Sequence, residues 1–222
     1  MTNELEIQTE QLLGAVVEMG ERADAMLAEA LEALAGADAE AAQRVVEADG
    51  AVDRGYERVQ HGVLAVVALH SPVGRDLRLL TALIHVSLHV ERMGDYAVSV
   101  ARTAERSAGF PADEDLTEQL VEMGQLAREV SRTAMRSFVH ADADLARTVP
   151  TLDDGVDRLN AGIFHRLVRL AAEDEPQLEW ATRMIGVARQ LERYADHGVD
   201  VAEQTLFVAT GEAKQLSSND PD

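Results

Sequence analysis

Apolar residues along this chain recur every three or four positions, which is the spacing of one face of an α-helix. The pattern is clearest in residues 79–101, LLTALIHVSLHVERMGDYAVSVA, and it returns in residues 185–205, IGVARQLERYADHGVDVAEQT. Valine, isoleucine, aromatic residues and two-residue hairpin turns are too thinly placed for a sheet. The pattern therefore predicts an all-α protein.

Breaks in this pattern divide the first half of the chain into three helices. The first is predicted over about 4–34, and Asp38 is a suitable N-cap for a second that runs to about His70. Pro72 breaks the pattern again and suits the first turn of a third helix. The acidic tract at 112–115 then follows a Gly-Phe-Pro sequence and is the expected domain boundary.

The second half of the chain repeats the first at a nearly constant offset. Three landmarks recur 104 residues later: Met19 as Met123, Asp38 as Asp142 and Pro72 as Pro176. A Glu-Arg-x-x-Asp sequence that begins at Glu91 returns at Glu192, 101 residues later. The repeat predicts two tandem three-helix bundles, six long helices in all, related by a pseudo-twofold axis. The predicted units are residues 1–110, residues 111–212 and a disordered polar tail over residues 213–222.

Acidic residues four apart form the most distinctive polar pattern on the predicted second and third helices. Residues at this spacing share a helix face, although two like charges there cost about 0.2–0.5 kcal/mol. Chance supplies several such pairs in a chain with 40 acidic residues, but not the same pairs at matching positions of both halves. The pairs are Asp49/Asp53 and Glu91/Asp95 in the first half, and Asp153/Asp157 and Glu192/Asp196 in the second.

Two interpretations of these pairs stay open. The second and third helices of each unit are expected to be antiparallel neighbours, so their pairs can meet. Four converging carboxylates suit a hard cation such as iron, Mn²⁺ or Mg²⁺, which predicts one metal site in each half. Alternatively, the acidic faces belong to a surface salt-bridge network. The arginines available for that network are Arg54, Arg92, Arg158 and Arg193.

Charge and composition exclude several classes of protein. The formal net charge of −20 argues against nucleic acid as a direct partner and against adhesion to anionic membranes. No apolar run approaches the length of about 18 residues that a membrane span needs, and the N-terminal stretch is acidic. Neither a signal peptide nor membrane insertion is therefore expected. The absence of cysteine fits a cytoplasmic protein.

No group of residues indicates an enzyme, and no catalytic or organic-cofactor residue is predicted. The main enzymatic alternative is a carboxylate-bridged di-iron protein, which needs Glu-x-x-His on its helices. Here Gly94 and Ala195 stand three residues after the two motif glutamates. His85 and His89 have a zinc-like spacing, but they lie far around the helix from Glu91 and are interpreted as ordinary helix residues.

These motifs resemble those of the PhoU family of phosphate-uptake regulators over about residues 4–210. Leu191-Glu192-Arg193 with Asp196-His197 is similar to the family sequence Leu-Glu-Arg-Ile-Gly-Asp-His, and Glu91 to Asp95 matches it in the first half. The paired aspartates of the second helices match its other motif. The departures are Met93 and Tyr194 for isoleucine, Ala195 for glycine and Tyr96 for histidine. An alanine at 195 is expected to crowd a close helix contact and to weaken the second site.

The resemblance implies a cytoplasmic, non-enzymatic negative regulator of the phosphate-starvation response and of phosphate uptake. Such a protein connects a phosphate ABC transporter to a sensor histidine kinase, and dimers are common, so a homodimer is expected. The resemblance also implies metal clusters, often iron, on the eight acidic residues, although some family members are seen without metal. A PhoU-like metal-binding scaffold that regulates another transporter or a stress response is the remaining alternative.

Overall fold

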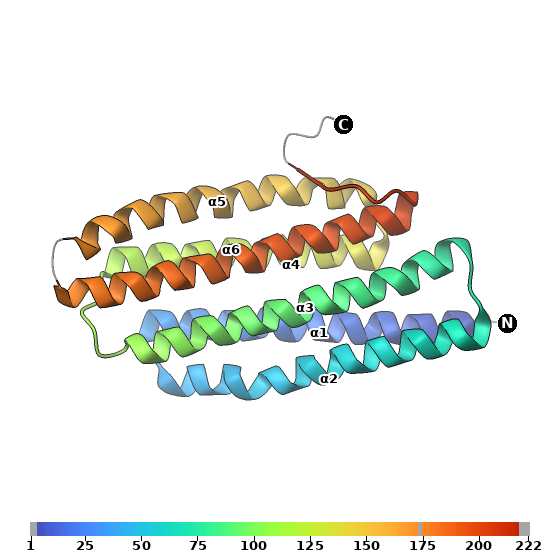
Figure 1. Ribbon diagram of the computed structural model, residues 1–222, viewed down its shortest axis with the longest axis horizontal. Coiled ribbons are helices and arrows are strands. Elements are labelled where there is room, and N and C mark those ends of the chain that lie inside the picture. Colours follow the sequence, from blue (N-terminus) through green and yellow to red (C-terminus); the bar gives the residue numbers. More distant parts are fainter. Residues whose placement is uncertain (1–3, 173–174, 218–222) are drawn as a thin grey trace.

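The computed structural model describes residues 4–172 and 175–217, and these residues form long helices and no strand. Figure 1 shows the helices lying roughly along the longest axis of the molecule. The predicted all-α fold with helices of about 30 residues is confirmed. The helices are α1 (Glu4–Gly36), α2 (Ala39–His70), α3 (Gly74–Ser107), α4 (Glu114–His140), α5 (Ala143–Ala171) and α6 (Glu175–Thr210).

Equivalent aspartates cap the second helix of each half, as the repeat predicts. Asp38 Oδ1 accepts hydrogen bonds from the backbone N–H groups at the start of α2, and Asp142 Oδ1 does the same at α5. These bonds satisfy donors that have no partner within the helix. The prediction for Pro72 is wrong by two residues, because α3 begins at Gly74 with Val73 in the capping position. Pro72 therefore precedes the helix and does not lie in its first turn.

Each half of the chain folds into a bundle of three mutually contacting helices, α1 to α3 and α4 to α6. The two bundles pack side by side (Figure 1), with α3 against α6 and α1 against α4. Each of these contacts joins a helix to its counterpart in the other repeat. This pairing of equivalent helices is what a pseudo-twofold relation between the repeats requires.

A charged pair and a glycine mark two close contacts of α4, one with α1 and one with α6. Arg128 on α4 donates two hydrogen bonds to the carboxylate of Asp24 on α1, at 2.9 and 2.8 Å, and both side chains are largely buried. Gly198 on α6 faces the backbone of Ser131 on α4, where an added Cβ would lie only 3.2 Å from the backbone nitrogen. The first contact joins the two halves, and the second fixes helix spacing within the second half.

The connection between α3 and α4 contains the predicted domain boundary, since α3 ends at Ser107 and α4 begins at Glu114. The division into units stays a prediction. The predicted tail is described as far as residue 217. There the backbone N–H of Leu216 donates a 2.9 Å hydrogen bond to Glu203 on α6, and the rest of the tail lies outside the described residues. Within the described ranges, no helix is both long and apolar enough to cross a bilayer.

Candidate functional site

The four acidic residues of the first half gather where α2 and α3 pack together. Desolvation raises the pKa of Asp49, and the charges of Asp53 on its own helix and Asp95 on α3 raise it further. Burial likewise raises the pKa of Glu91, with contributions from Asp95 and both α2 aspartates. The carboxylates are therefore close enough to repel one another across the two helices, as the sequence predicts. We call Asp49, Asp53, Glu91 and Asp95 the first acidic set.

The matching residues of the second half gather between α5 and α6. Burial raises the pKa of Asp153 to about 7, and the charges of Asp157, Asp196, Asp154 and Glu192 add to this effect. Such a carboxyl is partly protonated at neutral pH because its neighbours oppose a further negative charge. We call Asp153, Asp157, Glu192 and Asp196 the second acidic set.

In neither acidic set do the carboxylate oxygens converge on a common point. Among the described residues, neither brings three carboxylate oxygens within 4.8 Å of one another. One oxygen of Glu91, Oε2, is buried and has no hydrogen-bond partner. The structure thus places each predicted set together, while metal ligation by the sets stays a prediction.

The alternative salt-bridge network is present in part at the first acidic set. Arg92 lies 3.1 Å from Asp95 and 3.4 Å from Glu91, and its guanidinium is half exposed. In the part of the chain that the structure describes, Arg54, Arg158 and Arg193 form no ion pair with either set. Arg92 therefore offsets charge in the first set, whereas among the described residues no arginine forms an ion pair with the second set.

The difference between Gly94 and Ala195 has less effect on helix packing than expected from the sequence. A Cβ at Gly94 would lie 3.5 Å from Asp49 Oδ1 and 3.6 Å from Val52, which is ordinary van der Waals contact. A methyl group fits at this position, and the equivalent Ala195 is fully buried. Crowding by Ala195 is therefore no reason for the second acidic set to be the weaker one.

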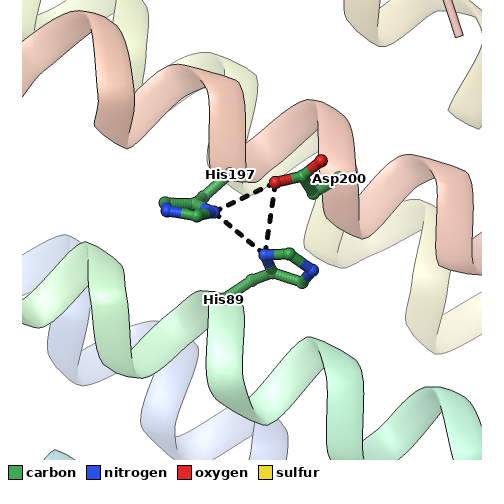
Figure 2. A group of neighbouring side chains, drawn as sticks. All are labelled: His89, His197 and Asp200. Carbon is green, nitrogen blue, oxygen red and sulfur yellow. Dashed lines mark hydrogen bonds and ion pairs between the residues drawn. The ribbon is translucent and has the colours of Figure 1, made fainter. Parts of the chain in front are cut away.

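Two histidines that are not among the predicted site residues lie together at the contact of α3 with α6. His89 on α3 and His197 on α6 place their Nδ1 atoms 2.9 Å apart, and Asp200 Oδ2 lies beside both (Figure 2). The sequence did not predict that His89 would have polar partners in the other repeat. The repeat gives one indication of this contact, since α3 and α6 are equivalent helices and equivalent helices can pack on each other across a pseudo-twofold axis. The packing of counterparts on one another is a tertiary feature that helix periodicity does not reveal.

The fold and its polar surfaces define a class of all-helical tandem-repeat proteins with an equivalent acidic set in each repeat. A family model described as the PhoU domain matches residues 16–104 and again residues 120–205. The chain belongs to the PhoU family, as its motifs indicate.

Curated relatives match over nearly their whole length. A protein of Deinococcus radiodurans is 32% identical over 95% of this chain and 99% of its own. A protein of Xylella fastidiosa is 32% identical over 91% of this chain and 85% of its own, and one of Clostridium acetobutylicum is 28% identical over 97% of both. All three are named phosphate-specific transport system accessory protein PhoU homolog.

Solved structures share the fold. The crystal structure of PhoU from Pseudomonas aeruginosa is 26% identical, with a TM-score of 0.87 over 94% of this chain and all of that chain. A phosphate transport system regulatory protein from Streptococcus pneumoniae, 24% identical, has the same TM-score over 96% of this chain, which shows the fold alone.

Proposed function

We propose that this protein is a negative regulator of phosphate uptake and of the phosphate-starvation response. The observation that carries the proposal is the end-to-end match, with both repeats, to relatives named as accessory proteins of the phosphate-specific transport system. The match of the family model to both repeats supports a shared mode of action. In this role the protein acts on other proteins and turns over no substrate.

The regulator acts as an adaptor between a phosphate ABC transporter and a sensor histidine kinase. Long helices offer extended faces for such contacts, and apolar side chains on a helix face can fit into a partner's groove. Leu69 and Val73, at the turn between α2 and α3, are 72% and 78% exposed. Because the net charge is −20, the protein reaches the membrane through these partners and not through lipid. We place it in the cytoplasm, as a homodimer.

The acidic sets fit a hard cation by the chemistry of their donors. All eight ligand candidates are carboxylates, and partial burial, together with their mutual repulsion, raises the pKa of Asp49, Glu91 and Asp153. A bound cation would offset this repulsion, and Oε2 of Glu91, which has no hydrogen-bond donor and only Arg92 Nε at 3.4 Å, offers it a buried acceptor. We propose that the two sets hold iron, manganese or magnesium, oxygen-preferring ions whose charge would complete the surface that partners contact.

A deletion strain tests the regulatory role. We expect loss of the gene to switch on a phosphate-starvation reporter in phosphate-rich medium, and a plasmid copy to restore silence. The purified protein should leave phosphate esters unhydrolysed. A reporter that stays silent at high phosphate, with any second copy of the gene also deleted, would contradict the role. It would favour the alternative of a scaffold for another transporter or a stress response.

Metal binding by the acidic sets is tested by removing one set at a time. We expect the variant with Asn at 153, 157 and 196 and Gln at 192 to lose about half of the bound Fe³⁺ or Mn²⁺, because one of two equivalent sets is gone. Calorimetry and elemental analysis measure the loss. The matched variant, with Asn at 49, 53 and 95 and Gln at 91, removes the first set and should lose a similar share. If both variants bind as the wild type does, the acidic sets are solvated surface and hold no metal.

A further inference from the structure

A group of three metal-ligating side chains lies outside the acidic sets, across the contact between the two repeats. His89 comes from α3, while His197 and Asp200 come from successive turns of α6. Figure 2 shows one ring nitrogen of each histidine and one carboxylate oxygen directed toward a common point. The Nδ1 atoms are 2.9 Å apart, and Asp200 Oδ2 lies 3.0 Å from His197 Nδ1 and 3.3 Å from His89 Nδ1.

With Asp200 ionised, protons alone cannot satisfy this triangle. A hydrogen bond along each edge to the carboxylate needs a proton on each histidine nitrogen, but two protonated nitrogens cannot hydrogen bond to each other. Whichever histidine nitrogens are protonated, at least one edge then sets two lone pairs or two N–H groups face to face. A cation at the centre instead accepts electron density from all three atoms at once. The geometry thus favours a metal over a hydrogen-bonded triad.

The spacing of the three atoms matches that of ligands around one transition-metal ion. Bonds of about 2.0–2.1 Å to zinc place tetrahedral ligands about 3.3 Å apart, and an octahedral ion with similar bonds places neighbouring ligands about 3.0 Å apart. The observed separations of 2.9–3.3 Å fall close to both values. Two histidines and one carboxylate on one face of an ion are a known donor set for zinc and ferrous iron.

The surroundings of the triangle also fit a metal site. The side chains of His89 and His197 are 18% and 21% exposed, whereas Asp200 is 41% exposed, so one side stays open to water. Tyr96 stacks on His197 and its hydroxyl lies 3.2 Å from Nε2, the nitrogen that points away from the triangle. Such outer contacts fix the orientation of a ligating ring.

We propose that His89, His197 and Asp200 form a binding site for a borderline divalent transition-metal ion such as Zn²⁺ or Fe²⁺. The site differs from the acidic sets in its donor chemistry and in its place. It joins α3 to α6, so metal binding ties one repeat to the other and favours one arrangement of the two bundles. Tyr96 is a positioning residue that orients His197. The inference stands independently of the proposed regulatory role.

Zinc calorimetry on the full-length protein, stripped with a chelator, tests this site. We expect the wild type to bind one equivalent of Zn²⁺ more than the His89→Gln and His197→Gln variants, and zinc to raise the Tm of the wild type more than theirs. His61→Gln, an exposed histidine on α2, is the matched control and should bind as the wild type does. Asp53→Asn and Asp157→Asn, which each remove one carboxylate from an acidic set, should keep this equivalent.

Two further measurements keep the test decisive if a glutamine variant folds poorly. Nuclear magnetic resonance should show zinc shifting the Nδ1 signals of His89 and His197 while that of His61 stays in place. Tyr96→Phe, which keeps the stacked ring and loses the hydroxyl, should weaken zinc binding about 10-fold. Equal zinc binding by wild type and His89→Gln, both folded by circular dichroism, would overturn the proposal. Unmoved Nδ1 signals in zinc-saturated wild type would overturn it as well.

Discussion

At the scale of single residues, the carboxyl group with the most perturbed pKa in the described part of the chain is that of Asp153 in the second acidic set. Its pKa of about 7 lies well above the ordinary 3.8 because of burial and the charges of Asp157 and Asp196. A group with a raised acid pKa binds more protons in the folded than in the unfolded state between these two values. Its contribution to stability is therefore present at low pH and is lost as the pH rises from about 4 to about 7.

Asp153→Asn should remove this loss in the metal-free protein. Relative to wild type, we expect the variant to gain stability as the pH rises from 4 to 7, reaching about 1 kcal/mol, since solvent screens a half-buried group. A gain of that size corresponds to about 2–4 °C in Tm. Thermal unfolding in chelator at several pH values measures it.

Glu57→Gln, at an exposed position of α2, is the control for Asp153→Asn. Its Tm should differ from wild type by the same amount at each pH. A pH-independent difference for Asp153→Asn would show that the carboxyl is not perturbed in the folded protein.

At the scale of helices, two glycines near the motifs have opposite roles. An added Cβ at Gly198 would lie 2.9 Å from Val130 Cγ1 and 3.3 Å from the Cα of Ser131, so α4 and α6 would have to move apart. Gly94 has room for a methyl group against Asp49 and Val52. The family resemblance singles out the glycine at 94, but the structure places the steric requirement at 198.

Gly198→Ala and Gly94→Ala should therefore change stability in opposite directions. We expect Gly198→Ala to destabilise the protein by about 1–3 kcal/mol through overpacking. Gly94→Ala should stabilise it by about 0.5 kcal/mol, because alanine loses less backbone entropy in a helix. Urea unfolding followed by circular dichroism gives both values. Equal effects of the two substitutions would show that α4 and α6 are not in close contact at Gly198.

Local patterns explain which features could be predicted from the sequence. Helix ends follow from capping aspartates such as Asp38 and from periodicity, and the acidic sets follow from the spacing of residues on neighbouring helices within one repeat. The meeting of His89 with His197 depends instead on how two repeats pack. No pattern within a helix specifies that contact, and the relative rotation of α3 and α6 decides it. The pairing of Asp24 with Arg128 depends on the same packing, although the two residues are 104 apart, which is the repeat offset, and so occupy equivalent positions of α1 and α4.

At the scale of the whole molecule, the ion pair between Asp24 and Arg128 joins α1 of one repeat to α4 of the other. Its two hydrogen bonds are short, and its side chains are only 18% and 15% exposed. Removing one member of such a pair leaves a desolvated charge, which costs more than the loss of an exposed ion pair. The pair therefore also specifies how the two repeats dock, since another arrangement would leave both charges buried without partners.

Arg128→Ala should lower the free energy of unfolding by about 2 kcal/mol and the Tm by about 4–8 °C, because Asp24 stays largely buried after its partner is lost. Arg132→Ala is the matched control, as Arg132 is half exposed and lies 3.8 Å from Asp24. It should change the Tm by less than about 2 °C. In the double variant Asp24→Asn/Arg128→Ala, the orphaned charge is gone, so part of the loss should be recovered. Calorimetry of the wild type, the single variants Asp24→Asn and Arg128→Ala, and the double variant measures this coupling. If Asp24→Asn adds its full cost to that of Arg128→Ala, the two residues act independently and do not hold the repeats together.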